Sequence, residues 1–258
     1  MWLTAVLIAV TLVVVVCLSA QLRSGAGAQV SVRPRGGAFT NRRAPRWPAV
    51  GVVLGLVAAV LMAQTGSLGR GLLVAPAAFA LCLLLGVLVG EVTVHAPSSG
   101  RRAALLERRR ARDYLPARLT AVVALCACLL LAVLTFTVLM GSADDMGRAG
   151  RVIATVCSPD ESASRGPWPG SFYALPLAAL VLVGFVASAV VLRQVSLRPR
   201  PTGDERLGAA ADALRRRSAG AVVAAVGVLV AVPFVGIAAV AALQLLGARC
   251  APAWWVVP

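Results

Sequence analysis

Six long stretches of apolar residues, each free of acidic and basic side chains, alternate with polar segments along the chain. Their predicted bounds are 2–20, 49–64, 71–90, 119–140, 172–192 and 219–246. A helix needs about 20 apolar residues to cross roughly 30 Å of hydrocarbon, which is close to the length of these stretches. The stretches are continuously apolar, so they lack the alternating pattern of a membrane β-barrel. We therefore predict an all-α, polytopic transmembrane bundle of six spans, forming a single membrane domain over residues 1–258.

The composition supports a membrane protein and argues against a nucleic-acid-binding one. Hydrophobic residues make up 59% of the 258 residues and charged residues 14%, whereas soluble domains average about 45–50% and about 25%. The net charge of +15 would indicate nucleic acid in a soluble chain. Here the arginines flank apolar stretches, and no aromatic residues are interleaved with them for base stacking. We expect no nucleic-acid partner.

The arginines predict the orientation in the membrane. Loops 21–48, 91–118 and 193–218 hold 20 of the 25 arginines, and lysine is absent. By the positive-inside rule these loops lie in the cytoplasm, and both termini lie on the exoplasmic side of the plasma membrane. Basic helices near 101–115 and 204–217 are expected to lie along the anionic inner leaflet. The arginines expected to contact it are Arg101, Arg102, Arg108, Arg109, Arg110, Arg215, Arg216 and Arg217.

The segment 141–171 is the large exoplasmic loop of this threading. Ser142 followed by Asp145 resembles a capping box, and Asp144 lies four residues before Arg148, so we predict a short surface helix here. The following stretch 158–170 is rich in Ser, Pro and Gly and is predicted to be irregular.

Cysteine usage suggests a disulfide on the exoplasmic side. Of the six cysteines, only Cys157 and Cys250 lie outside the predicted spans, and both fall on the side where disulfides persist. We hypothesise a Cys157–Cys250 bridge between the outer loop and the C-terminal tail. The alternative is two unpaired thiols, because sequence does not show whether the two Cα atoms approach each other.

Few residues suggest chemistry. The acids of the outer loop could hold a hard cation, but arginines lie among them, so local ion pairs are the simpler expectation. His95 lies four residues after Glu91 and fits an interfacial polar pair. We assign no catalytic residue, metal or cofactor. The outer acids are Asp144, Asp145, Asp160 and Glu161.

The absence of certain residue types and catalytic motifs argues against several classes of function. The predicted spans carry no acid, base or histidine, which argues against a proton- or ion-coupled carrier. Without lysine there is no P-loop, and HExxH and GxSxG motifs are missing. The sequence favours a non-catalytic accessory subunit that binds a membrane or cytosolic partner. The alternatives are a facilitator for a small neutral solute, using kinks at Pro76 and Pro233, and a membrane enzyme using the exoplasmic acids.

Two phrases of the second half resemble known sequences. SADDMGRAGR (142–151) and PWPGSFYALP (167–176), together with the use of arginine alone as the basic residue, are similar to uncharacterised multi-pass integral membrane proteins of high-GC actinobacteria. The resemblance implies a plasma-membrane setting and brings no activity or site residue.

Overall fold

A computed structural model describes residues 46–65, 67–93, 114–158, 161–197, 205–247 and 251–252. By length and composition, five of its helices are able to cross a membrane. They are α2 (Arg46–Gln64), α3 (Arg70–Thr93), α4 (Ala117–Leu139), α5 (Ser171–Leu197) and α6 (Glu205–Leu246). The first four coincide with the predicted apolar stretches to within five residues at either end. The predicted span 2–20 lies outside the described residues.

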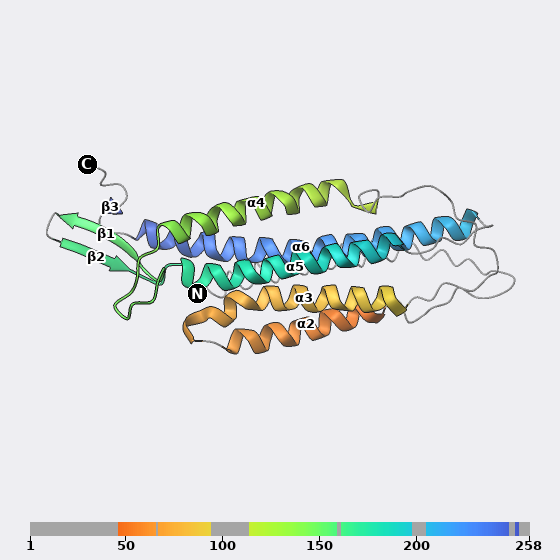
Figure 1. The fold of residues 1–258 in the computed structure, drawn as a ribbon, viewed down its shortest axis with the longest axis horizontal. Helices are drawn as coiled ribbons and strands as arrows, with labels where there is room; N and C mark the ends of the chain where they lie inside the picture. The colour runs from red at the N-terminus through yellow and green to blue at the C-terminus, as the bar shows by residue number, and fades with distance from the viewer. Residues whose placement is uncertain are drawn as a thin grey trace.

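Helix α6 differs from the prediction. A separate basic helix ending near residue 217 and a span beginning at 219 were expected, but α6 is one helix of 42 residues. At 1.5 Å per residue it is about 63 Å long, roughly twice the hydrocarbon thickness. The predicted break is wrong because residues 209–217 are mainly Ala, Leu and Arg, which are good helix formers, and no proline separates them from the apolar run. The basic part of α6 therefore continues the span rather than lying across it (Figure 1).

The helices form an elongated bundle around α3, α5 and α6. Helix α2 packs along α3, to which it is joined by the short 3₁₀ turn η1 (Ser67–Gly69), and α4 packs mainly on α6 (Figure 1). Because α2 and α4 each contact few other helices, much of their apolar surface is exposed. That surface suits contact with lipid.

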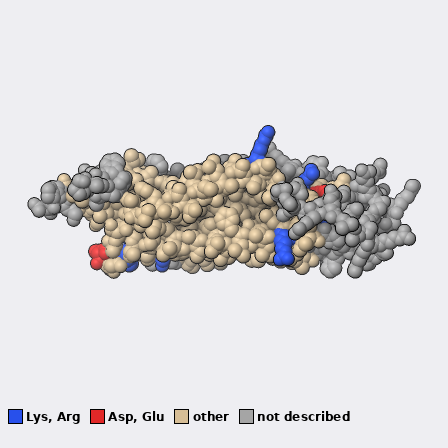
Figure 2. Space-filling model, turned by 45° about the horizontal axis from the view of Figure 1, so that its top comes forward, with Lys and Arg blue, Asp and Glu red and all other residues tan. Residues whose placement is uncertain are grey.

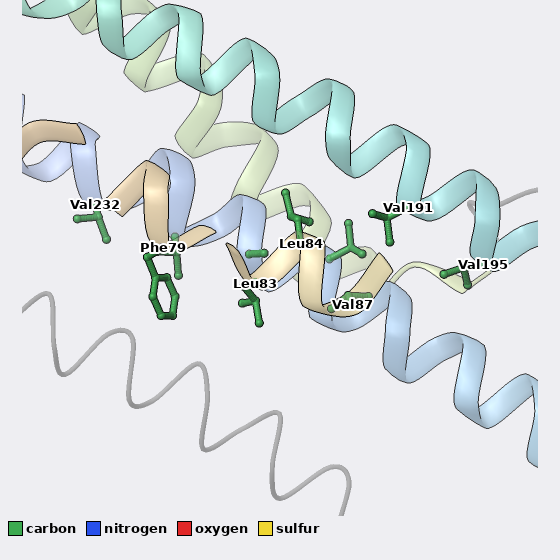
Figure 3. Close-up of a cluster of buried hydrophobic side chains, with 10 residues drawn as sticks. Phe79, Leu83, Leu84, Val87, Val191, Val195 and Val232 are labelled. Atoms are coloured by element: carbon green, nitrogen blue, oxygen red, sulfur yellow. The ribbon is translucent and has the colours of Figure 1, made fainter. Parts of the chain in front are cut away.

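The interior between the central helices is apolar. Figure 3 shows Phe79, Leu83 and Leu84 of α3 near Val191 and Val195 of α5 and Val232 of α6. The buried Thr137 and Ser188 each bond within their own helix. Thr137 donates to the Leu134 carbonyl at 3.1 Å, and Ser188 donates to the Phe185 carbonyl at 2.7 Å.

Glycines bring α2 and α3 into backbone contact. A Cβ added at Gly51 would lie 2.9 Å from the Cys82 carbonyl oxygen, and one added at Gly86 would lie 2.7 Å from the Trp47 carbonyl oxygen. Small residues at such positions allow dispersion contacts between backbones, which drive helix association where water is absent.

A small sheet lies at one end of the bundle. Strands β1 (Ile153–Ser158), β2 (Glu161–Arg165) and β3 (Ala251–Pro252) form an antiparallel sheet in the order β2-β1-β3. The prediction that 158–170 is irregular is therefore wrong for β2. The predicted helix within 142–151 is also wrong: this segment forms turns, because Gly147 and Gly150 adopt φ of 73° and 71°.

Substituting Gly86 with Ala should weaken the α2–α3 contact. The added methyl group meets backbone atoms, which cannot move aside independently, so we expect a loss of about 1–3 kcal/mol. Thermal unfolding of the purified protein in detergent measures it. Gly236→Ala is the matched control, since no atom lies within 4 Å of its added Cβ. Equal melting temperatures for the two variants would contradict the proposed close contact.

Candidate functional site

The end of the bundle that carries the sheet, here called the sheet end, joins segments far apart in sequence. Arg70 at the start of α3 donates to the Phe172 carbonyl oxygen from Nε at 3.3 Å and from Nη2 at 3.0 Å. In an unbroken helix this oxygen would accept from residue 176, but that residue is Pro176, which has no N–H. The proline thus leaves an acceptor that Arg70 satisfies, and the contact fastens α3 to α5.

A second bond from α5 holds the turn between α2 and α3. The Tyr173 hydroxyl donates to the Leu68 carbonyl oxygen at 2.9 Å. Leu68 has φ of 65°, and it is the one non-glycine residue with positive φ among the described residues. This conformation costs about 1–2 kcal/mol for an L-residue. The Tyr173 bond helps to hold the turn in it.

Residues 141–158 and 161–170, together with β3, form a cap on the sheet end. Asp144 organises the turn of this cap. Its Oδ2 accepts from Arg148 Nε and Arg151 Nη1, both at 2.8 Å. Its Oδ1 accepts from the backbone N–H groups of Met146 at 3.1 Å and Arg148 at 2.8 Å. The local ion pairs expected from the sequence are confirmed for Asp144, although they stabilise a turn and not a helix.

The same contacts set the titration of Asp144. Burial acts to raise the pKa of the carboxyl group, but the hydrogen bonds from Arg148 and Met146 and the charge of Arg148 outweigh it. The net effect lowers the pKa below its ordinary value of 3.8. Asp144 is therefore ionised at neutral pH and fully engaged, which makes it a structural group rather than a free base.

Trp168 fastens the cap to the helices. Its side chain is fully buried, its Nε1 donates to the Thr137 carbonyl oxygen at 2.8 Å, and its ring meets Phe136 edge-on at 6.3 Å. It also packs with Ile153 of β1 and Ala241 of α6. Sequence reasoning did not single out Trp168. The available signal was an aromatic residue between two prolines just before an apolar span.

Arginines at the two ends of the bundle have different surroundings. At the sheet end Arg165 donates to Gln244 Oε1 at 2.8 Å and to the Gly247 carbonyl oxygen. Arg70, Arg148 and Arg151 also bond to protein groups, so every described arginine at this end has a partner within the protein. At the opposite end the exposed arginines are Arg118, Arg193, Arg216 and Arg217. Figure 2 shows a broad belt without charged side chains between the two ends.

Arg215 does not follow its expected role. It is 4% exposed, pairs with Asp212 at 2.7 Å, and lies 5.8 Å from the Tyr114 ring centroid. This position does not fit direct contact with the inner leaflet, unlike the exposed Arg216 and Arg217. The other arginines expected at the leaflet, Arg101, Arg102, Arg108, Arg109 and Arg110, lie outside the described residues.

The remaining predicted groups are only partly described. Asp145 is exposed on the turn, Glu161 begins β2, and Asp160 and His95 lie outside the described residues. Within the described part of the chain, no group of three or more His, Cys, Asp or Glu residues could hold a metal ion.

The cysteines divide into two groups. Cys82, Cys126 and Cys128 are free thiols in the helices. Cys157 in β1 is disulfide-bonded. Its predicted partner, Cys250, lies outside the described residues.

Comparisons with models of protein families, with curated proteins and with solved structures gave no significant match to this chain. The resemblance to actinobacterial membrane proteins thus stays an expectation, and the function has to be argued from the geometry.

Replacing Asp144 with Asn should make the cap less stable at neutral pH. It should also remove part of the dependence of the protein's thermal stability on pH. The lowered pKa means that the stabilising contribution of the carboxylate is complete above about pH 4 and is lost as the pH falls through the lowered value. The difference between wild type and Asp144→Asn should therefore shrink below pH 4. Thermal unfolding between pH 7 and pH 3 measures it, with the exposed Asp145→Asn as control. A difference that stays constant with pH would show that the charge of Asp144 is not what matters.

Proposed function

We propose that this protein is a plasma-membrane subunit of six spans that binds a partner protein through its cap and catalyses no reaction. Both termini and the cap lie on the exoplasmic side, and the basic loops lie in the cytoplasm. The arginines support this orientation. Those at the sheet end are engaged by the protein, whereas Arg118, Arg193, Arg216 and Arg217 at the opposite end are exposed and can meet anionic lipid.

The ordered cap is the observation that carries the proposal. Its backbone is fixed by Asp144 and its base by buried Trp168. On this frame Met146 is 72% exposed at the turn. A pre-ordered loop loses little conformational entropy on binding, and methionine adapts to varied apolar surfaces. An apolar side chain held on a fixed polar turn is suited to enter a partner's pocket.

The helix interior favours a scaffold over a conduit. In the described helices the buried side chains are hydrophobic apart from Thr137, Ser188 and Arg215. The Thr137 and Ser188 hydroxyl groups bond within their helices, and Arg215 is paired near the end of the bundle. Two other buried hydroxyl groups of these helices also lie near the ends: Tyr173 bonds to Leu68, and Thr120 lies in the first turn of α4. A pathway for a polar solute would need polar groups along its length.

Site-specific photo-crosslinking in the original host tests the proposal. A photoreactive residue in place of Met146 should give a discrete protein adduct. The matched control is Leu131, which is 66% exposed in the middle of α4 and should face lipid. Native mass spectrometry after gentle extraction should then show the same protein in stoichiometric amount. A lone chain with no adduct at position 146 would contradict partner binding and favour the facilitator, to be tested by flux into proteoliposomes.

We also infer that Cys250 is the partner of Cys157. Strand β3 pairs with β1 so that Val156 lies opposite Ala251 and Thr155 opposite Pro252. Continuing this antiparallel register by one residue brings position 250 opposite Cys157. Directly opposed residues have Cα atoms about 4.5–5.5 Å apart, which is within the range that a disulfide spans. The bridge would fasten the C-terminal tail to the cap.

A non-reducing peptide map of the mature protein should contain one linked peptide pair that includes Cys157 and Cys250. Cys82, Cys126 and Cys128 serve as internal controls and should be alkylated without reduction. Recovery of Cys157 linked to Cys17, or of both Cys157 and Cys250 as free thiols, would rule out the inferred bridge.

A further inference from the structure

The Phe172 ring lies close to two guanidinium groups from different elements. The Cζ atom of Arg70, from α3, is 3.8 Å from the ring centroid, and that of Arg151, from the cap, is 5.4 Å away. Stacking on an aromatic ring restricts the orientation of a guanidinium group, while N–H groups not already bonded to the protein can still bind a ligand. We propose that Arg70 and Arg151 form a binding site for a phosphate group at the membrane surface.

Positive charge exceeds negative charge at this place. Arg70 bonds only to a neutral carbonyl oxygen and has no ion-pair partner among the described residues. Arg151 shares the single carboxylate of Asp144 with Arg148. The first turn of α5, which carries Phe172, contains no acidic residue. Of the two guanidinium groups at the Phe172 ring, Arg70 thus has no acidic partner in the described part of the chain and Arg151 only a shared one, so a bound anion would reduce their mutual repulsion.

Arg151 carries an unused donor. Its Nε atom is buried and has no hydrogen-bond partner, although the side chain as a whole remains 13% exposed. A buried N–H group without an acceptor is unfavourable, and such groups often indicate a ligand or ion. Nε and a terminal nitrogen of one guanidinium group form the fork that matches two phosphate oxygens.

The height of the site along the bundle indicates which anion it meets. Arg70 is the first residue of α3, at the start of its apolar stretch 70–90, and Phe172 is the second residue of α5. Both lie where the apolar belt ends, at the level of the lipid headgroups. The abundant anion in that layer is the phosphodiester of a phospholipid. Arg70 and Phe172 lie at this depth in either orientation, so the proposed site does not rest on the proposed function.

The test uses full-length protein, delipidated in detergent and examined by native mass spectrometry with three probes. These are phosphatidylglycerol, phosphatidylcholine and inorganic phosphate. Wild type should bind one phosphatidylglycerol more tightly than phosphatidylcholine, whose choline group offsets the phosphate charge. Arg151→Gln and Arg70→Gln should each weaken this binding about tenfold, the scale of a lost charge-assisted hydrogen bond.

Arg165→Gln is the matched control, because it removes a sheet-end guanidinium group that bonds to Gln244 and Gly247 and not to the groups of the proposed site. It should bind phosphatidylglycerol as wild type does. Arg151→Lys keeps the charge without the fork and should bind more weakly than wild type, so the proposal stays testable if Arg70→Gln does not fold. Displacement of the lipid by inorganic phosphate would support the site and assign it a soluble phosphate as well. Equal lipid binding by Arg151→Gln and Arg165→Gln would overturn it and leave Arg70 and Arg151 as contacts that hold α3, α5 and the cap together.

Discussion

The structure of the sheet end depends on one backbone carbonyl group, that of Phe172, which has no N–H donor within its own helix. In a low-dielectric environment each backbone acceptor needs a partner, and Pro176 denies one to Phe172. Arg70 supplies it from another helix, and in doing so brings a charged group to the sheet end of the bundle. Phe172 then packs against Arg70 and lies near Arg151 of the cap. One proline thus determines how α3, α5 and the cap meet.

The two ends of the bundle use arginine in different ways, and this difference links structure to function. At the sheet end each described arginine is bound to a carbonyl, an amide or a carboxylate, so these arginines order the cap. At the opposite end most described arginines project outward and Arg215 is buried. The ordered end would suit recognition of a partner and the basic end would suit an anionic leaflet, as expected of the accessory subunit that we propose.

Hydrophobic patterning predicted the helices well because a membrane helix is defined mainly by a long uncharged run, as in α3 and α4. It failed at the start of α6, where polar residues with high helix propensity extend the helix past the end of the apolar run. It also missed the sheet, whose β3 strand pairs with residues almost 100 positions away. The Asp144 ion pairs were predictable because they are local. The roles of Trp168 and Arg70 were not, because their partners are 31 and 102 residues distant.

We propose that the cap faces outward and that the exposed arginines face the cytoplasm. Fusing alkaline phosphatase, which is active only outside the cytoplasm, after Pro258 tests this orientation. A fluorescent protein that folds only in the cytoplasm, fused at the same site, gives the comparison. Our account predicts an active phosphatase and a dark fluorescent fusion. A fluorescent fusion with an inactive phosphatase would place the cap in the cytoplasm and contradict the orientation, the disulfide and the exoplasmic partner together.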